Sequence, residues 1–107
     1  MIFRGIIMQI NIDKVDRIIL LLEENIKLLS ENDEKRWAEV LIRLKRHYIE
    51  NDNNEETLSL IRKLFGGAGT FNDVVLHKDG KPLIEENNQL EKSRHELYEE
   101  CINKMTQ

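Results

Sequence analysis

Four of the chain's five glycines and its only proline fall within one short stretch, LFGGAGTFNDVVLHKDGKPL, at Leu64–Leu83. Glycine and proline are the two residues that interrupt a regular helix most strongly. On both sides of this stretch the sequence is charged and leucine-rich, with apolar residues at the three- and four-residue steps of amphipathic helices. The chain is therefore expected to be helical, with one interruption before its last helix.

Apolar spacing predicts three helices before the interruption. The first runs from about Ile12 to Leu29, where Asn11 or Asp13 can cap it, and it ends at Ser30–Asp33. The second spans about Glu34–Asn51. The third is short: Asn53 or Asn54 can cap it, and it ends before Gly66–Gly67, one of which is expected to adopt the left-handed conformation.

The interruption itself reads as a loop followed by a small hairpin. Phe71 is expected to return to the core, and a strand at Val74–His77 leads through an Asp79–Gly80 turn to Leu83. Pro82 precedes the last helix, which spans about Ile84–Lys104. The predicted fold is mainly α: a four-helix bundle with a small β-hairpin inserted before the last helix.

One domain, residues 1–107, accounts for a chain of this length. Residues 1–10 are interpreted as a loosely ordered N-terminal extension, and the alternation in Met8–Asp13 also allows a short strand. Either Met1 or Met8 is compatible with a native start. No apolar run approaches the roughly 18–20 residues of a membrane span, and the single Cys101 fits a reducing cytoplasm.

The charge balance weighs against a nucleic-acid binder. The chain carries 20 acidic and 16 basic residues, for a net charge of −4, and the two signs are interleaved. Nucleic-acid binders usually present a basic face. An acidic surface suits solubility, and it also suits a cationic protein partner, because opposite potentials steer the encounter.

Residues that could support catalysis or cofactor binding do not form a coherent set. GGAGTFND has glycines and Thr70 but lacks the lysine of a phosphate-binding loop. Asp73 and His77 would share a face only in a helix, and one cysteine cannot build a structural zinc site. We therefore expect no cofactor, no metal and no enzymatic activity. The alternative is a catalytic pocket lined by Asn72, Asp73, His77 and Arg94.

The segment KRWAEVLIRLKRHYIENDNNEETLSLIRKLFGGAGTFNDVVL resembles a small bacterial family in which a helix bearing a W-A motif precedes a GG-x-G-[ST]-F-N-D motif. A final helix in that family carries an arginine and an E-x-Y or E-L-Y element. The matching positions, within about Glu34–Cys101, are Trp37, Ala38, Gly66, Gly67, Gly69, Thr70, Phe71, Asn72, Asp73, Leu76, Arg94, Glu96, Leu97 and Tyr98. Ala68 stands where methionine is more typical. Small acidic proteins of this kind occur as immunity proteins beside bacterial toxins, including contact-dependent growth inhibition systems.

The resemblance and the charge balance together predict a cytoplasmic immunity protein that binds and neutralises a cognate toxin domain, a basic nuclease. The expected contact residues are acids near the hairpin: Asp73, Asp79, Glu85 and Glu86. Each is equally an ordinary surface charge, and Asp73 is also suited to capping the loop. The alternative is a non-enzymatic homodimeric or regulatory module, using a patch of apolar residues outside the main helical stripes: Leu20, Leu21, Leu28, Ile42 and Ile49.

Overall fold

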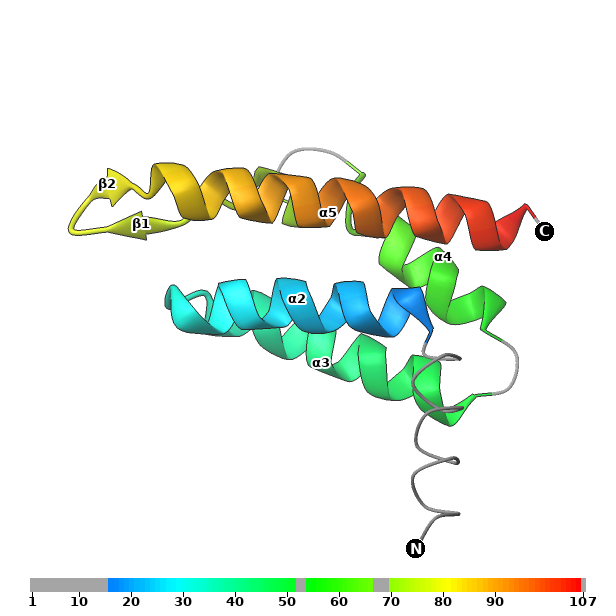
Figure 1. The fold of residues 1–107 in the computed structure, drawn as a ribbon. Helices are drawn as coiled ribbons and strands as arrows, with labels where there is room; N and C mark the ends of the chain where they lie inside the picture. The colour runs from blue at the N-terminus through cyan, green and yellow to red at the C-terminus, as the bar shows by residue number, and fades with distance from the viewer. Residues whose placement is uncertain (1–15, 52–53, 67–69, 107) are drawn as a thin grey trace, which may run out of the picture.

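A computed structural model describes residues 16–51, 54–66 and 70–106. These residues form four α-helices and one two-stranded antiparallel hairpin before the last helix, which confirms the predicted fold class (Figure 1). The helices are α2 (Arg17–Glu31), α3 (Lys35–Glu50), α4 (Glu55–Lys63) and α5 (Ile84–Met105). No helix in these ranges is both long enough and apolar enough to cross a membrane.

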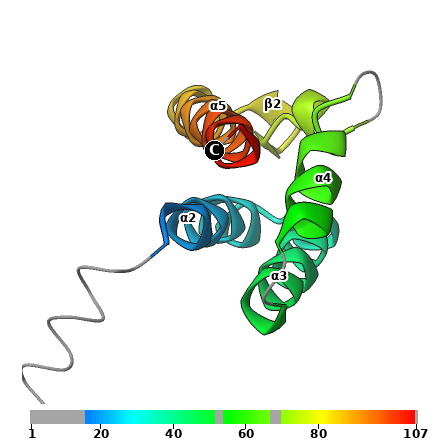
Figure 2. The ribbon, with the colours of Figure 1, turned by 90° about the vertical axis from the view of Figure 1, so that its right-hand side faces the viewer.

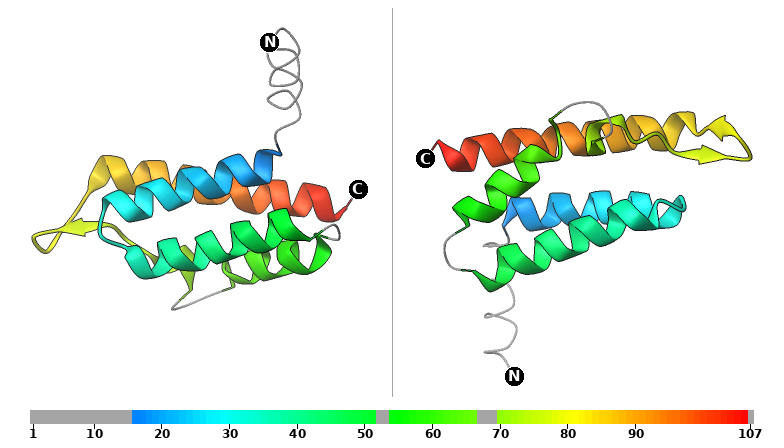
Figure 3. Two further views of the ribbon diagram at one scale, coloured as in Figure 1. Left: turned by 90° about the horizontal axis from the view of Figure 1, so that it is seen from below. Right: turned by 180° about the vertical axis from the view of Figure 1, so that it is seen from behind.

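The helices pack in two layers. α2 and α3 form an antiparallel pair, and α5 lies along the other side of α2, with α4 crossing between the end of α3 and α5 (Figures 1 and 2). The views from below and behind show the same pairing, with the hairpin extending past the turn that joins α2 to α3 (Figure 3). The hairpin is therefore a projection from the bundle.

α2 begins later than the sequence predicted. Asp16 has an extended backbone, and its Oδ1 accepts a hydrogen bond from the Ile18 N–H at 2.9 Å, so Asp16 rather than Asn11 or Asp13 caps the helix. The predicted first turn, together with the predicted strand at Met8–Asp13, lies outside the described residues. The other three helices agree with their predicted bounds to within a few residues.

The hairpin is shorter than predicted. β1 (His77–Lys78) pairs with β2 (Lys81–Pro82), and Asp79 and Gly80 adopt positive φ angles of 54° and 77° in the turn between them. The predicted strand began at Val74, but the backbone of residues 74–76 is bonded instead to side chains of α5, which removes it from the ladder. Of the two glycines expected to be left-handed, Gly66 is not, and Gly67 lies outside the described residues.

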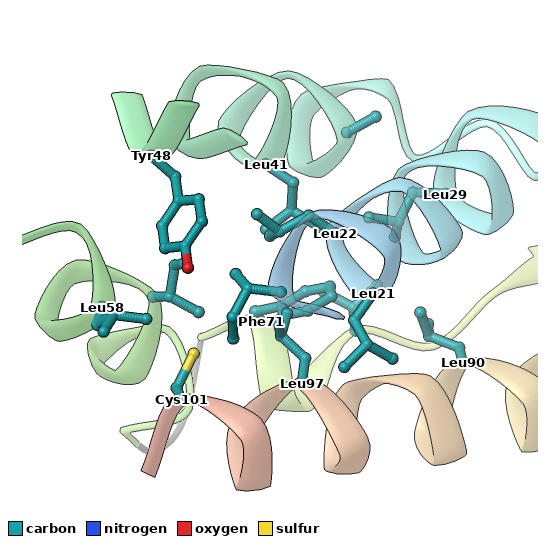
Figure 4. Packing of buried hydrophobic residues seen from close by; sticks show 14 of the residues in the cluster. Leu21, Leu22, Leu29, Leu41, Tyr48, Leu58, Phe71, Leu90, Leu97 and Cys101 are labelled. Carbon is teal, nitrogen blue, oxygen red and sulfur yellow. The ribbon is translucent and has the colours of Figure 1, made fainter. Parts of the chain in front are cut away.

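The core lies between the two layers and draws on every helix. Figure 4 shows Phe71 in the middle of the labelled side chains, between Tyr48 and Leu41 on one side and Leu97 and Cys101 on the other. Phe71 is 0% exposed, as expected of a residue that returns to the core. Phe71 belongs to a 3₁₀ turn, η1 (Phe71–Asp73), so this turn is packed into the bundle through its first residue.

One polar pair lies within this core. Asn25 of α2 is fully buried, and its Nδ2 donates to Ser93 Oγ of α5 and to Leu21 O, both at 2.8 Å. Asn25 Oδ1 has no hydrogen-bond partner among the described residues. A buried pair of this kind adds little net stability, but it favours one register of α2 against α5, because sliding either helix would leave both side chains unpaired.

Candidate functional site

Aromatic side chains from three parts of the chain meet at the glycine-rich segment. The Phe71 ring lies 5.5 Å from Trp37 of α3 and 5.8 Å from Phe65, which follows α4. Phe65 in turn meets Tyr98 of α5 edge to face, at 5.2 Å between ring centroids. These rings hold η1 against the bundle, because the aromatic pairs contribute beyond their buried area.

Arg94 of α5 fixes the same turn from the other side. Its Nη1 donates to the Phe71 and Val74 carbonyls at 2.8 and 2.9 Å, and its guanidinium lies 5.5 Å from the Phe71 ring centre. Burial lowers the pKa of Arg94, and the charges of Glu91 and Asp73 partly offset that effect. Arg94 thus acts as a clamp on residues 71–74, which include Phe71 and Asp73 of the resembled motif.

Asn87 performs the corresponding task at the base of the hairpin. Its Oδ1 accepts from Leu76 N–H at 2.7 Å, and its Nδ2 donates to the carbonyls of Leu76 and Leu83 at 2.9 and 2.7 Å. The Leu83 N–H also donates to Leu76 O at 2.9 Å. One side-chain amide therefore satisfies backbone groups in both arms and fixes how the hairpin leaves α5.

A groove of about 630 Å³ runs between η1 and α5. Aromatic residues form part of its wall, and polar side chains surround them; the lining residues are Phe65, Asn72, Asn88, Glu91, Lys92, His95 and Tyr98. Only Asn72 of the predicted catalytic pocket lies there. His77 belongs to β1, and Arg94 is occupied by the two carbonyls. The structure does not bring the four residues of that alternative into one pocket.

Three of the four predicted contact residues share one end of the molecule. Asp79 is at the hairpin tip, and Glu85 and Glu86 are in the first turn of α5. Asp73 lies elsewhere, in η1, beside the part of α5 that carries Arg94, about 14 Å along the helix axis from Glu85 at 1.5 Å per residue. The acids at the tip are also accompanied by Lys78 and Lys81, so this end carries both signs of charge.

Two exposed apolar residues lie among these charges, and sequence reasoning missed them. Leu76 is fully buried and Leu83 packs partly against the core, whereas their outward neighbours Val75 and Ile84 are 44% and 75% exposed. The two arms are joined at Leu76 and Leu83, so Val75 and Ile84, the first residue of α5, follow that pair at the base of the hairpin. The alternation in VVLH and PLI was the available signal. We call residues 75–86 the hairpin end.

A second polar cluster joins three helix ends. Asp16 Oδ2 accepts from the Tyr48 hydroxyl at 2.5 Å and from Lys104 Nζ at 2.7 Å. Burial alone would raise the pKa of Asp16, but hydrogen bonds from Lys104, Tyr48 and Ile18 outweigh it and leave that pKa below its usual value. Burial and Asp16 raise the pKa of Tyr48, and the bond to Asp16 raises that of Lys104.

The remaining candidate groups have packing roles. Cys101 is buried, and burial raises the pKa of its thiol to about 12, which suppresses the reactive thiolate. His47 of α3 is hydrogen-bonded to buried Thr57 of α4, and His95 pairs with Glu99 one turn away. In the part of the chain that the structure describes, no group of three or more His, Cys, Asp or Glu side chains could hold a metal ion.

The apolar patch predicted for a homodimer is smaller than expected. Leu20, Ile42 and Ile49 are exposed at 51%, 40% and 57%. Leu21 is buried at 3% exposure, and Leu28 packs partly against the core. These two predictions were wrong because α2 is covered on two sides, by α3 and by α5, so its buried stripe is wider than that of a helix with one neighbour.

Comparison with known proteins places part of the chain in a family. A family model described as a domain of unknown function (DUF6966) matches residues 30–84, slightly more than half of the chain. The matched range contains α3, α4, η1 and the hairpin. No curated protein and no solved structure matches.

Proposed function

We propose that this chain, which belongs to the family of the domain of unknown function DUF6966, is a protein-binding module that holds its partner at the hairpin end. The observation that carries the proposal is the exposure of Ile84, at 75%, and of Val75, at 44%, where the projecting hairpin joins the bundle. Interfaces draw most of their binding energy from a few apolar anchors inside a polar rim. Val75 and Ile84 have that arrangement.

The rim supplies the charge that selects a partner. Asp79, Glu85 and Glu86 are acidic, and Lys78 and Lys81 lie at the tip. Glu85 and Glu86 stand in the first turn of α5, where the helix dipole already favours a negative charge, so these acids do not repel the helix that bears them. A partner with basic side chains around an apolar pocket would complement this end.

The partner that we propose is a cognate bacterial toxin domain, a basic nuclease, and the chain would act as its cytoplasmic, non-enzymatic immunity protein. The segment GG-x-G-T-F-N-D resembles that of a small bacterial family, and small acidic proteins of this kind occur as immunity proteins, which supports this identification together with the net charge of −4. Arg94 and Asn87 would then serve binding indirectly, because they fix the hairpin before the partner arrives and so reduce the ordering that binding must supply.

The proposal is tested by affinity capture from the native bacterium with three baits: the wild type, Ile84→Lys and Ile49→Lys. We expect the wild type and Ile49→Lys to retain a nuclease domain, and Ile84→Lys to lose it. The wild-type chain should inhibit the purified nuclease in a 1:1 ratio. The Ile84→Lys chain should leave the nuclease active.

A captured partner that keeps its full activity in the complex would exclude the immunity role. Equal capture by Ile84→Lys and the wild type, with both chains folded by circular dichroism, would place the binding surface elsewhere. Because Ile84 is largely exposed, the substitution is not expected to impair folding.

A further inference from the structure

A groove of about 400 Å³ lies between α2 and α3 and is lined by residues of these two helices alone. Figure 2 shows how α2, α3 and α5 are arranged. Isoleucines form its apolar part and charged side chains its borders; the lining residues are Glu23, Ile26, Lys27, Ile42, Lys45, Arg46, Ile49 and Glu50. Leu20 lies one turn before Glu23 on the same face of α2. This face holds three of the large apolar residues that are exposed among the described residues, Leu20, Ile42 and Ile49.

At the level of one salt bridge the two borders carry charges of opposite sign, whereas Lys27 on α2 and Glu50 on α3 reverse these signs further along the groove. Glu23 stands on α2 and Lys45 on α3, and the two form a salt bridge of 3.0 Å. Arg46 extends the basic border beyond Lys45. Ile26 and Ile42 each stand three residues from the salt bridge. Because the helices are antiparallel, both side chains lie on the same side of the bridge, about 4.5 Å from it along the helix axis. Leu20 and Ile49, three and four residues from the salt bridge, lie at nearly the same level on the other side of the bridge.

We propose that this groove binds the same groove of a second copy of the chain. A two-fold axis parallel to the helices places α2 of each copy over α3 of the other, and the four helices form an antiparallel bundle. Leu20 then meets Ile49 of the second copy, Ile26 meets Ile42 of the second copy, and Glu23 meets Lys45 and Arg46 of the second copy. Each apolar level finds an apolar partner, and acids face bases.

The charges distinguish this arrangement from the other two-fold packing. An axis perpendicular to the helices would place α3 on α3, with Lys45 and Arg46 of one copy against the same residues of the other. Like charges held together in an interface disfavour that packing. The apolar part of the face is small compared with the roughly 800 Å² that each partner buries in a standard interface, so the dimer is expected to dissociate on dilution.

Sedimentation equilibrium of the full chain tests the proposal over about 1 µM to 1 mM, the range in which a modest dimer dissociates. We expect the mass to rise from 12.7 kDa toward twice that value. Ile49→Lys should hold the chain at the monomer mass at every concentration. Ile84→Lys is the matched control, since it makes the same change at an exposed isoleucine on the hairpin end and should dimerise like the wild type.

A charge-swap experiment tests whether the charged borders of the groove hold the two copies together. Glu23→Lys makes both borders basic, and the Lys45→Glu/Arg46→Glu variant makes both acidic, so each variant alone should stay monomeric. An equimolar mixture should form a heterodimer, because α2 and α3 of one variant then face opposite charges on the other. Circular dichroism and thermal unfolding of each variant check that loss of association is not loss of folding.

Three results would overturn the proposal. A wild-type chain that is monomeric throughout the range excludes the second copy, and a large loss of stability in Ile49→Lys would then indicate that the chain's own residues 1–15 cover the groove. A dimer that survives Ile49→Lys but not Ile84→Lys would locate the interface at the hairpin end. A mixture of charge variants that stays monomeric would exclude association through the charged borders of this groove. None of these three results changes the nuclease binding expected of Ile49→Lys, so the dimer and the proposed function are tested separately.

Discussion

Arg94 shows how one side chain can account for a motif. A buried cation requires partners, and here they are two backbone carbonyls and an aromatic face rather than a carboxylate. Arginine suits this position because one guanidinium nitrogen, Nη1, donates to both carbonyls while the guanidinium carbon lies 5.5 Å from the centre of the Phe71 ring.

Substitution of Arg94 should destabilise the chain well beyond the loss of an ordinary surface charge. Arg94→Met removes the charged donor from the Phe71 and Val74 carbonyls. Phe71 O keeps the Val74 N–H at 3.2 Å, whereas the buried Val74 carbonyl loses the donor that Arg94 supplies, and an unsatisfied buried group costs about 1–3 kcal/mol. We expect the free energy of unfolding to fall by about 2–4 kcal/mol in urea titrations.

The control for this prediction is Arg17→Met. Arg17 pairs with Glu96 and Glu100 at 3.0 and 3.6 Å, but its side chain is 58% exposed, so its loss should cost under about 1 kcal/mol. Equal losses in the two variants would show that the carbonyl bonds of Arg94 add no more than a surface ion pair.

Among the elements, the helix ends are joined more specifically than the helix middles. Asp16 caps α2 and binds Tyr48 near the end of α3 and Lys104 near the end of α5. Three elements are therefore aligned at one end of the bundle by a single carboxylate. At the opposite end Asn87 joins the hairpin to α5. A periodic apolar pattern locates the middle of a helix better than its ends. In this protein polar side chains define those ends.

The Asp16 cluster predicts how stability depends on pH. The pKa of Asp16 is lowered by folding, so its contribution is present above the usual value of 3.8 and is lost as the pH falls through the lower folded value. The pKa of Lys104 is raised, so its contribution is present below 10.5 and is lost as the pH rises through the higher folded value. Stability should therefore be greatest between these two limits.

Asp16→Asn isolates the acidic limb. Asparagine retains the cap on Ile18 but removes the charged bonds to Tyr48 and Lys104, so we expect a loss of about 1–2 kcal/mol at pH 7. The melting temperature of the variant should also fall less steeply than that of the wild type between pH 5 and pH 2. Asp79→Asn, at the exposed hairpin tip, is the control. If Asp16→Asn leaves the loss of stability between pH 5 and pH 2 unchanged, that loss arises from other carboxylates.

The sequence specified the helices better than the contacts between them. Apolar spacing gave α3 and α5 within a residue or two, because one repeated pattern extends over many positions. The strand predicted at Val74 failed because bonds from Arg94 and Asn87, residues 20 and 11 positions away, replace the ladder. Ser93 and Arg94 are buried although both are polar, and their partners lie in other elements. Such long-range pairs leave no local signal.

The candidate site was predicted in part. The turn residues Asp79 and Gly80 indicated where the chain projects, so three acids were assigned to the correct end of the molecule. Val75 and Ile84 were missed because valine and isoleucine next to leucine suggest burial, and only the pairing of Leu76 with Leu83 turns them outward. The contact residues were predicted from charge alone. That prediction therefore omitted Val75 and Ile84, the apolar residues that lie among the charged ones.

At the scale of the whole molecule, the two proposed binding surfaces depend on one core. The hairpin end is fixed by α5, the groove lies between α2 and α3, and Phe71 lies between the two layers. α2 contacts both α3 and α5, and α4 contacts both α3 and α5, so no helix can leave without exposing part of the same cluster. This closed set of contacts predicts cooperative unfolding as one domain.

Trp37, the only tryptophan, provides the test because its ring lies against Phe71, at the junction of the glycine-rich segment and α3. Its fluorescence reports whether η1 is docked, whereas far-ultraviolet circular dichroism reports the helices. We expect urea transitions followed by the two signals to coincide at a given protein concentration. If the fluorescence changes at lower urea than the dichroism, η1 and the hairpin undock from helices that remain folded. The hairpin end would then belong to a separate, weaker unit, and Arg94→Met should shift the first transition only.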